Sequence, residues 1–475
     1  MRPRCWSITV SAAISLGASS LASAQTQVVR PAFAGKLTSC RVAALQEDVL
    51  CGRRTVYEDR TAARGRTIAL NVVVLPATTD SVLDEPLVFL AGGGVVPATR
   101  YARFLATSMP ALRRHRDIVL VDQRGTGASN ALTCDRPSLD TAAGLPPDER
   151  YLRYIAACRE SLASRADLRW YTTAQAIDDL DDVRSWLGYH ALELYGASYG
   201  TSVAAAYIRK YPSRVRAVVM HGVVPLDVPM QVDLARSAQQ SLDRVFELCA
   251  ADAACNAAYP EARADLARVL ARFDSAAASG TAVQRRNAGQ PFREAVNNAL
   301  ASIAGIRNVP MLVHNVAQGV PPGDGAPPPG PEPAPLGVRL AILCSEGLSA
   351  VDTSTISATT ARTFLGEFVR FQLRWCEGWP TAPLPSGFRA PFRSAVPALL
   401  LTGELDPITP PSYAAHVGEW FERSTVLRLA NRSHSDTDPC VTGLIEEFIV
   451  SGGRPPDSSC LASSPPIQFA TRSSR

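Results

Sequence analysis

Short β-type runs alternate with amphipathic helical segments along most of the chain. Apolar residues recur on one helical face of residues 174–187, and residues 201–211 also have a helical pattern. Apolar or alternating runs predict strands over 67–75, 86–90, 117–121, 192–195, 215–220, 396–401 and 425–429. Strands that alternate with helices form a mostly parallel sheet covered on both faces. The pattern therefore predicts an α/β fold with a doubly wound sheet.

Four acidic residues lie largely outside the apolar face of the predicted helix 174–187. They are Asp178, Asp179, Asp181 and Asp182. Because the apolar residues account for the buried side of this helix, we expect the acidic run to be a solvated face and not a metal site.

The pattern changes between residues 228 and 388, which are rich in Ala and Arg, have helical periodicity and lack strand runs. This stretch includes the Pro-rich segment 321–335, which we expect to be a surface loop because proline sustains neither a helix nor a central strand. A chain of 475 residues also exceeds the size of one hydrophobic core, about 250–300 residues. The sequence predicts a core built from 25–227 and 389–475, interrupted by a helical cap at 228–388.

Residues 1–24 have the pattern of a signal peptide, with early arginines, an apolar stretch and a small-residue cleavage site. No later stretch is long and apolar enough to span a bilayer, so we expect export to the periplasm or the medium without membrane insertion. Cleavage leaves an even number of cysteines, which favours disulfides over zinc, since C-x-x-C spacing is absent. Pairing of sequence neighbours is the simplest arrangement: Cys40–Cys51, Cys134–Cys158, Cys249–Cys255, Cys344–Cys376 and Cys440–Cys460.

The charge is nearly balanced, with 48 Lys and Arg against 44 Asp and Glu. Proteins that bind nucleic acids usually carry a clear excess of Lys and Arg, so this composition does not indicate nucleic-acid binding. No phosphate-binding loop is present, and we expect no cofactor or metal ion.

The segment Gly196-Ala197-Ser198-Tyr199-Gly200 matches the G-x-S-x-G motif between a predicted strand and a predicted helix. A nucleophile at that junction occupies a sharp turn that needs small neighbours, and the helix N-terminus can stabilise an oxyanion. Ser198 is therefore the candidate nucleophile.

A serine nucleophile needs a histidine base and an acid that orients the histidine. In proteins with this motif the acid follows the serine along the chain, and the histidine follows the acid. His434 lies in a loop after the strand 425–429, and Asp406 lies in a loop after the strand 396–401. Glu404, in the same loop as Asp406, is the alternative candidate for the acid. The other histidines are disfavoured by their order, by closeness to the motif, by a place in the insertion or by a helical setting. Asp436 and Asp438 lie in the same loop as His434 and are too close to it to be the first choice for the acid.

An oxyanion site also needs a second backbone donor, from a loop after an early strand. Gly93 and Gly94 follow the strand 86–90 and complement the N–H of Tyr199. Glycine allows close approach of the backbone to a ligand, although three glycines after a strand also occur in ordinary turns.

Together these segments resemble the prolyl and tripeptidyl aminopeptidase branch of the α/β-hydrolase superfamily. The resemblance rests on FLAGGG, DIVLVDQRGTGASN, LYGASYGT, LLLTGELDPITPP and the His434 loop before Cys440. It implies a serine peptidase with an α/β-hydrolase fold, whose helical cap admits short peptides. The segment Cys344-Ser345-Glu346 resembles the family's Cys-x-Glu segment, which makes Glu346 the candidate ligand of the substrate α-amine. The chain departs from the family at Val95, at His221-Gly222 and at Ser433-His434-Ser435.

The expected function is an exported aminopeptidase that uses Ser198, His434 and Asp406 in an acyl-enzyme mechanism. Two alternatives stay open. One is a carboxylesterase acting on small esters, and the other is a binding protein without catalytic activity on a hydrolase fold.

Overall fold

The computed structural model describes residues 31–42, 45–93, 96–135, 147–278, 280–281, 289–322, 335–352, 356, 360, 363–366 and 368–471. The predicted signal peptide, most of the Pro-rich segment and Gly94 lie outside these ranges. Within them, every helix is too short or too polar to span a bilayer.

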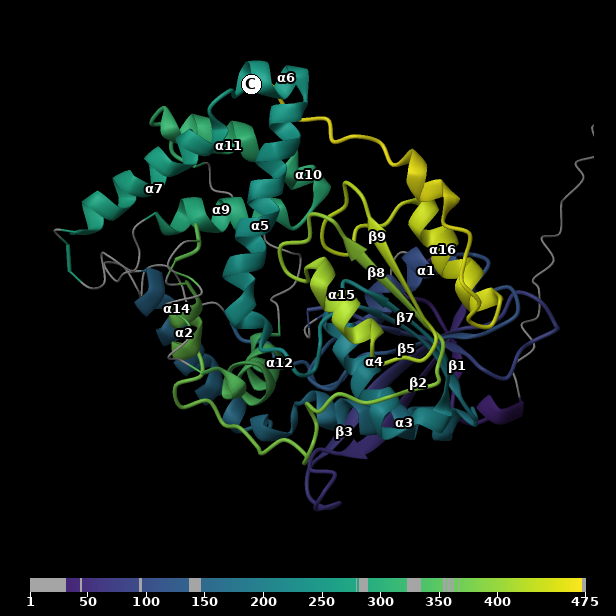
Figure 1. Cartoon of the computed structure of the whole chain (residues 1–475). Coiled ribbons are helices and arrows are strands. Elements are labelled where there is room, and N and C mark those ends of the chain that lie inside the picture. The colour runs from purple at the N-terminus through teal and green to yellow at the C-terminus, as the bar shows by residue number, and fades with distance from the viewer. Residues whose placement is uncertain are drawn as a thin grey trace, which may run out of the picture.

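A nine-stranded sheet forms the centre of the molecule, in the order β1-β2-β3-β5-β4-β6-β7-β8-β9 (Figure 1). Neighbours from β5 through β9 in this order pair in parallel, whereas β1, β2 and β3 extend the sheet in antiparallel fashion. The predicted α/β-hydrolase fold with a mostly parallel sheet is confirmed. The strands are β1 Thr38–Cys40, β2 Val49–Tyr57, β3 Thr67–Leu75, β4 Leu87–Leu90, β5 Ile118–Val121, β6 Leu192–Ala197, β7 Val215–His221, β8 Ala398–Gly403 and β9 Ser424–Leu429.

Helices cover both faces of the sheet because successive strand residues point to opposite sides. In β7, Val218 and Met220 pack with α3 (Thr173–Leu187), α4 (Tyr199–Lys210) and α15 (Pro411–Gly418). The alternate β7 residues pack with the helices on the opposite face, α1 (Ala102–Ser108) and α16 (Pro439–Val450). Both faces of the central strands are therefore buried.

The segment between β7 and β8 contains helices in its described part, and these belong to two packing groups. One group has its own hydrophobic core, whereas α12 packs with α2 and Trp375 against the cluster on the α3 face of the sheet. The sequence pattern predicts a single cap and does not indicate this division. The first group comprises α5 Met230–Ala251, α6 Ala253–Ala258, α7 Ala262–Ala278, α9 Gln290–Leu300, α10 Ile303–Ile306 and α11 Val309–Ala317. The other helices of this segment are α12 Leu336–Ile342 and α14 Phe368–Arg374, whereas α2 Pro147–Ala163 lies between β5 and β6.

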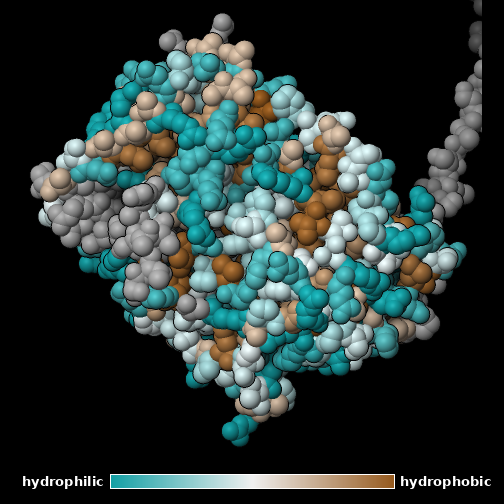
Figure 2. Space-filling model, viewed as in Figure 1, coloured by the Kyte–Doolittle hydropathy of each residue, from teal (hydrophilic) through white to brown (hydrophobic). Residues whose placement is uncertain are grey.

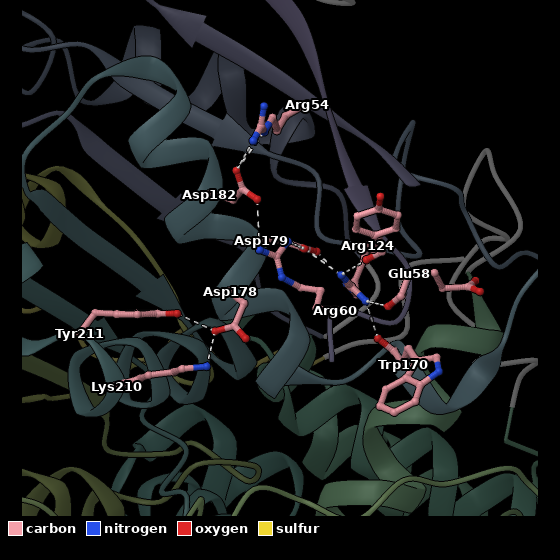
Figure 3. A network of polar contacts seen from close by, with 11 residues as sticks. Arg54, Glu58, Arg60, Arg124, Trp170, Asp178, Asp179, Asp182, Lys210 and Tyr211 are labelled. Carbon is pink, nitrogen blue, oxygen red and sulfur yellow. Dashed lines mark hydrogen bonds and ion pairs between the residues drawn. The ribbon is translucent and has the colours of Figure 1, made fainter. Parts of the chain in front are cut away.

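The acidic run on α3 is not the solvated face that the sequence predicts. Asp179 is 2% exposed, and Arg124, which is fully buried, donates to both of its carboxylate oxygens at 2.6 and 2.7 Å (Figure 3). The other three aspartates are half-buried and paired with cations. The prediction is wrong for Asp179 because the turn after β2 and the loop after β5 lie against this side of α3, where Arg60 and Arg124 neutralise it.

Five disulfides join the cysteine pairs that are neighbours in sequence. The bonded pairs are Cys40–Cys51, Cys134–Cys158, Cys249–Cys255, Cys344–Cys376 and Cys440–Cys460. One of them fastens the π-helical turn Leu343–Gly347, which carries Glu346, to the segment after α14.

Candidate active site

Ser198 lies in a strained turn between β6 and α4. Its backbone has φ 53° and ψ −124°, an unusual conformation for a residue with a side chain. The turn is held by a hydrogen bond from Ser198 N–H to the carbonyl of His221 at 2.8 Å. The sequence context predicts this turn, because the strand and the helix immediately flank the serine.

Two glycines make the turn sterically possible. A Cβ on Gly200 would lie 2.0 Å from the carbonyl oxygen of Leu90, and one on Gly196 would lie 2.5 Å from the carbonyl oxygen of Gly200. Both distances are far inside van der Waals contact, so only glycine fits. As a result the end of β4 packs directly against the turn that carries Ser198.

The structure brings Ser198, His434 and Asp406 into one hydrogen-bonded chain. His434 Nε2 lies 2.8 Å from Ser198 Oγ, and His434 Nδ1 lies 2.8 Å from Asp406 Oδ2. Asp406 is 2% exposed. These residues come from three loops at the carboxyl edge of the parallel strands, which is where α/β folds place their sites. The arrangement can move a proton from a serine hydroxyl to an imidazole whose orientation a carboxylate fixes.

Asp406 is held by its own loop. The N–H groups of Ile408 and Thr409 each donate to Asp406 Oδ1 at 2.8 Å, and Thr409 Oγ1 donates to Oδ2 at 2.5 Å. Thr409 Oγ1 also lies 3.1 Å from His434 Nδ1. Thr409 is a site residue that is not among those predicted from the sequence, although its place three residues after Asp406 is a turn signal.

The alternative acid is engaged elsewhere. Glu404 Oε1 accepts from Arg244 at 3.1 Å, and Glu404 Oε2 accepts from the N–H of Asn431 at 3.3 Å. The structure therefore places Asp406, and not Glu404, against His434.

His221 is buried beside this chain of hydrogen bonds. Its side chain is fully buried, and neither ring nitrogen has a hydrogen-bond partner within the described part of the molecule. Burial, together with the nearby His434, lowers the pKa of His221 to about 4, so the ring is neutral near neutral pH. In sequence terms, closeness to the Ser198 motif disfavours His221 as the base. In the structure, His221 lies next to the candidate triad but is not part of its hydrogen-bonded chain.

The two predicted oxyanion donors come from different elements. Tyr199 is the first residue of α4, and the first N–H groups of a helix have no acceptor within the helix. Gly93 has φ 71°, and the preceding Gly92 is close enough that a Cβ there would lie 3.1 Å from Ser198 Cβ. The described part of the glycine loop is therefore adjacent to the nucleophile.

Glu346 approaches the site from the cap. Its carboxylate accepts from the N–H and Oγ1 of Thr173 at 2.5 and 2.6 Å, and Thr173 Oγ1 lies 2.6 Å from the hydroxyl of Tyr199. Burial raises the pKa of Glu346 to about 7, against the opposing effects of the Thr173 hydrogen bonds and the Arg389 charge. No local signal in the sequence indicates Thr173, because its partners lie far away along the chain.

The described residues offer no group of three His, Cys, Asp or Glu side chains arranged to hold a metal ion. The site thus consists of a hydroxyl, an imidazole, carboxylates and backbone amides.

Two family models and several known proteins are similar to parts of this chain. The family model described as "alpha/beta hydrolase fold" matches residues 85–298, and the model described as "TAP-like protein" matches residues 362–460. The serine protease Hip1 of Mycobacterium tuberculosis is 29% identical over 226 residues, which cover 44% of this chain and 42% of that protein. The tripeptidyl aminopeptidase of Streptomyces coelicolor is 32% identical over 199 residues, which cover 38% of this chain and 36% of that protein.

Among solved structures, a proline iminopeptidase from Mycobacterium smegmatis aligns with 87% of this chain and 100% of its own, at 16% identity and a TM-score of 0.40. The chain spans about two fifths of the length of the curated relatives it matches. The sheet topology, the serine turn and the two family models together show that the chain belongs to the α/β-hydrolase superfamily, with a TAP-like segment in its C-terminal part.

Proposed function

We propose that this chain is an exported serine hydrolase that removes residues or short peptides from peptide N-termini. The single observation that carries the hydrolase proposal is the hydrogen-bonded chain from Ser198 through His434 to the buried Asp406. The names of the curated relatives, a serine protease and a tripeptidyl aminopeptidase, support peptides as the substrate.

The chemistry follows from the positions of these groups. Ser198 Oγ attacks the substrate carbonyl carbon while His434 Nε2 takes the hydroxyl proton, and Asp406 stabilises the imidazolium that forms. The negative oxygen of the tetrahedral intermediate is stabilised by the N–H of Tyr199 and by the backbone of the glycine loop at Gly93. His434 then gives its proton to the leaving amine, and a water molecule releases the acyl group by the same steps in reverse.

Replacing the nucleophile tests the hydrolase proposal. We expect Ser198→Ala to lower kcat by roughly 10⁴-fold or more, because the groups of such a triad act as a unit. The measurement is hydrolysis of chromogenic peptides and short esters, with covalent labelling by a fluorophosphonate probe as a second readout. A wild-type protein that the probe does not label would favour the non-catalytic alternative, and an active Ser198→Ala protein would refute the assignment.

The choice between a peptidase and an esterase depends on Glu346. A half-buried carboxylate linked through Thr173 to Tyr199 is suited to bind a protonated α-amine, which supports the aminopeptidase. However, both carboxylate oxygens already accept from Thr173 at the start of α3, where a carboxylate also stabilises a helix N-terminus. This second role favours the carboxylesterase as the alternative function.

Glu346→Gln separates the two functions. For an aminopeptidase we expect kcat/KM on free-amine peptides to fall by about 30-fold or more, since an ion pair with the substrate is lost. Hydrolysis of N-blocked peptides and small esters should change little. Equal losses on both substrate classes would contradict a role in amine recognition.

Glu193→Gln is the matched control for this experiment. Glu193 is a buried carboxyl whose pKa, like that of Glu346, is raised by burial to about 7, but it lies near the start of β6 and pairs with Arg116 at 2.7 Å. The control should alter stability and leave the preference for free amines unchanged.

We also infer that the protein is exported. The five disulfides support this, because such bonds persist in oxidising compartments. Fractionation of the native host, with detection of the protein in periplasm or medium, tests the inference.

A further inference from the structure

The loop that carries Asp406 is bound to the cap. Ser241 Oγ, on α5, donates to the carbonyl of Leu405 at 2.7 Å, and both residues are buried. The Leu405 side chain is fully buried in the hydrophobic core that α5, α9 and α11 share. The residue next to the candidate acid is thus part of the cap interior.

The loop that carries His434 is bound to the cap as well. Ser433 is fully buried. Its Oγ donates, at 2.5 Å, to the carbonyl of Leu300 at the end of α9. On the other side of the histidine, the carboxylate of Asp436 accepts from the N–H of Ser433 at 2.8 Å, and the backbone of Ile303, at the start of α10, favours the charged form of this carboxylate. The cap therefore contacts residues on both sides of His434.

The two loops are also joined to each other. The N–H of Leu405 donates to the carbonyl of Arg432 at 2.9 Å, and a Cβ on Gly403 would lie 2.2 Å from the carbonyl oxygen of Ser433. Both loops follow strands of the sheet, β8 and β9, and both donate or accept hydrogen bonds with helices of the cap. A shift of the cap would move Asp406 and His434 relative to Ser198, which sits on the β6–α4 turn.

We propose that Ser241 and Ser433 are positioning residues through which the cap keeps Asp406 and His434 aligned with Ser198. The proposal rests on the proposed serine hydrolase function. It makes the cap part of the catalytic scaffold as well as a cover over the substrate. Catalysis is sensitive to such alignment, because a misplacement of about 1 Å can lower a rate by about 100-fold.

The test compares kcat, KM and the rate of fluorophosphonate labelling in the full-length Ser241→Ala and Ser433→Ala proteins. The probe is small and reacts at Ser198, so its rate reports on the alignment of the triad and not on substrate fit under the cap. We expect each variant to lose about tenfold in kcat and in labelling rate, with KM within twofold of wild type. The double variant should lose more than either single one.

Thr360→Ala is the matched control. Thr360 is fully buried, and its Oγ1 donates to the carbonyl of Ile356 at 2.9 Å, so the variant also deletes a buried hydroxyl bonded to a carbonyl. We expect a similar drop in Tm with wild-type kcat and labelling rate.

The outcomes are distinguishable. Wild-type labelling rates in both serine variants would overturn the proposal, as would an equal loss in Thr360→Ala, which would indicate a general effect of cap stability. A wild-type protein that is not labelled at all would instead refute the proposed function. If Ser433→Ala does not fold, Ser241→Ala and its control still decide the question.

Discussion

At the scale of single residues, Glu346 has two properties that act against each other. Burial disfavours its charged form, whereas two short hydrogen bonds from Thr173 favour it, and the outcome is a pKa of about 7. A carboxyl with an ordinary pKa near 4.3 would be charged throughout the range in which peptidases are usually assayed. Glu346 instead changes charge within that range.

This property predicts a pH dependence specific to free-amine substrates. Recognition of a protonated α-amine needs the charged carboxylate, so it should weaken as pH falls through about 7. It should also weaken above about pH 8, where α-amines lose their proton. We expect the ratio of kcat/KM for a free-amine peptide to kcat/KM for a small ester to be highest between these values.

The ratio is the appropriate measurement because pH effects on the steps that both substrates share cancel in it. In Glu346→Gln both limbs of this ratio should flatten, because no charged carboxylate remains to distinguish a protonated α-amine from a neutral one. A ratio that is constant from pH 5 to 8 in the wild type would argue against amine binding by Glu346.

At the scale of elements, Arg124 connects four segments with one side chain. Beyond Asp179 on α3, it donates at 2.8 Å to the carbonyl of Glu58, after β2, and at 2.8 Å to the carbonyl of Trp170 (Figure 3). It belongs to the loop after β5, whose Gln123 donates to the hydroxyl of Tyr199 at 3.2 Å. The buried charge thus orders a loop that borders the candidate site.

We predict that Arg124→Met lowers the free energy of unfolding by about 3–5 kcal/mol, because it leaves the charge of Asp179 buried without its main partner. Urea denaturation measures this loss. Adding Asp179→Leu should recover part of it, since the uncompensated charge is then removed as well.

The matched control is Arg41→Met, which breaks a pair between Arg41 and Asp48 whose side chains are 77% and 53% exposed. Exposed pairs contribute about 0–1 kcal/mol, so this variant should remain close to wild type. A similarly small effect of Arg124→Met would mean that water or other cations replace the guanidinium.

At the scale of the whole molecule, the C-terminal segment crosses from the sheet domain to the cap. After α16 it runs to the cap helices near α6, where the C-terminal end of the chain lies (Figure 1). Ile467 is 7% exposed within the cap core, and the N–H of Ala470 donates to the carbonyl of Arg307 at 2.9 Å.

On the face seen in Figure 2, hydrophilic and hydrophobic surface are interspersed.

We predict that Ile467→Ala destabilises the cap by about 2–5 kcal/mol, the usual effect of removing a large buried aliphatic group. Hydrogen exchange should then increase in α5–α11 more than in α3 and α4. Val450→Ala is the control, since Val450 is 52% exposed and its truncation should alter neither region. Uniform exchange changes in Ile467→Ala would show that the cap and the sheet domain unfold together.

Sequence reasoning predicts the features of this protein that depend on neighbouring residues. The turn at Ser198 follows from glycines two residues away on either side, and the parallel strands follow from continuous apolar runs. The strand β2 is missed because Gly52, Arg53 and Arg54 interrupt its apolar pattern. Arg54 is explained only by its partner Asp182 on α3, more than 100 positions away in the chain.

The sequence by itself determined the α/β-hydrolase fold, the order of Ser198, Asp406 and His434, and the pairing of neighbouring cysteines as the simplest arrangement. Tertiary structure alone decided that Asp179 is buried, that Thr173 and Thr409 join the site, and that the cap binds the loops of Asp406 and His434. The physical reason is the range of the interactions involved. Periodicity and turn chemistry act between neighbours in the chain, whereas burial and hydrogen bonding between distant loops exist only after the chain has packed.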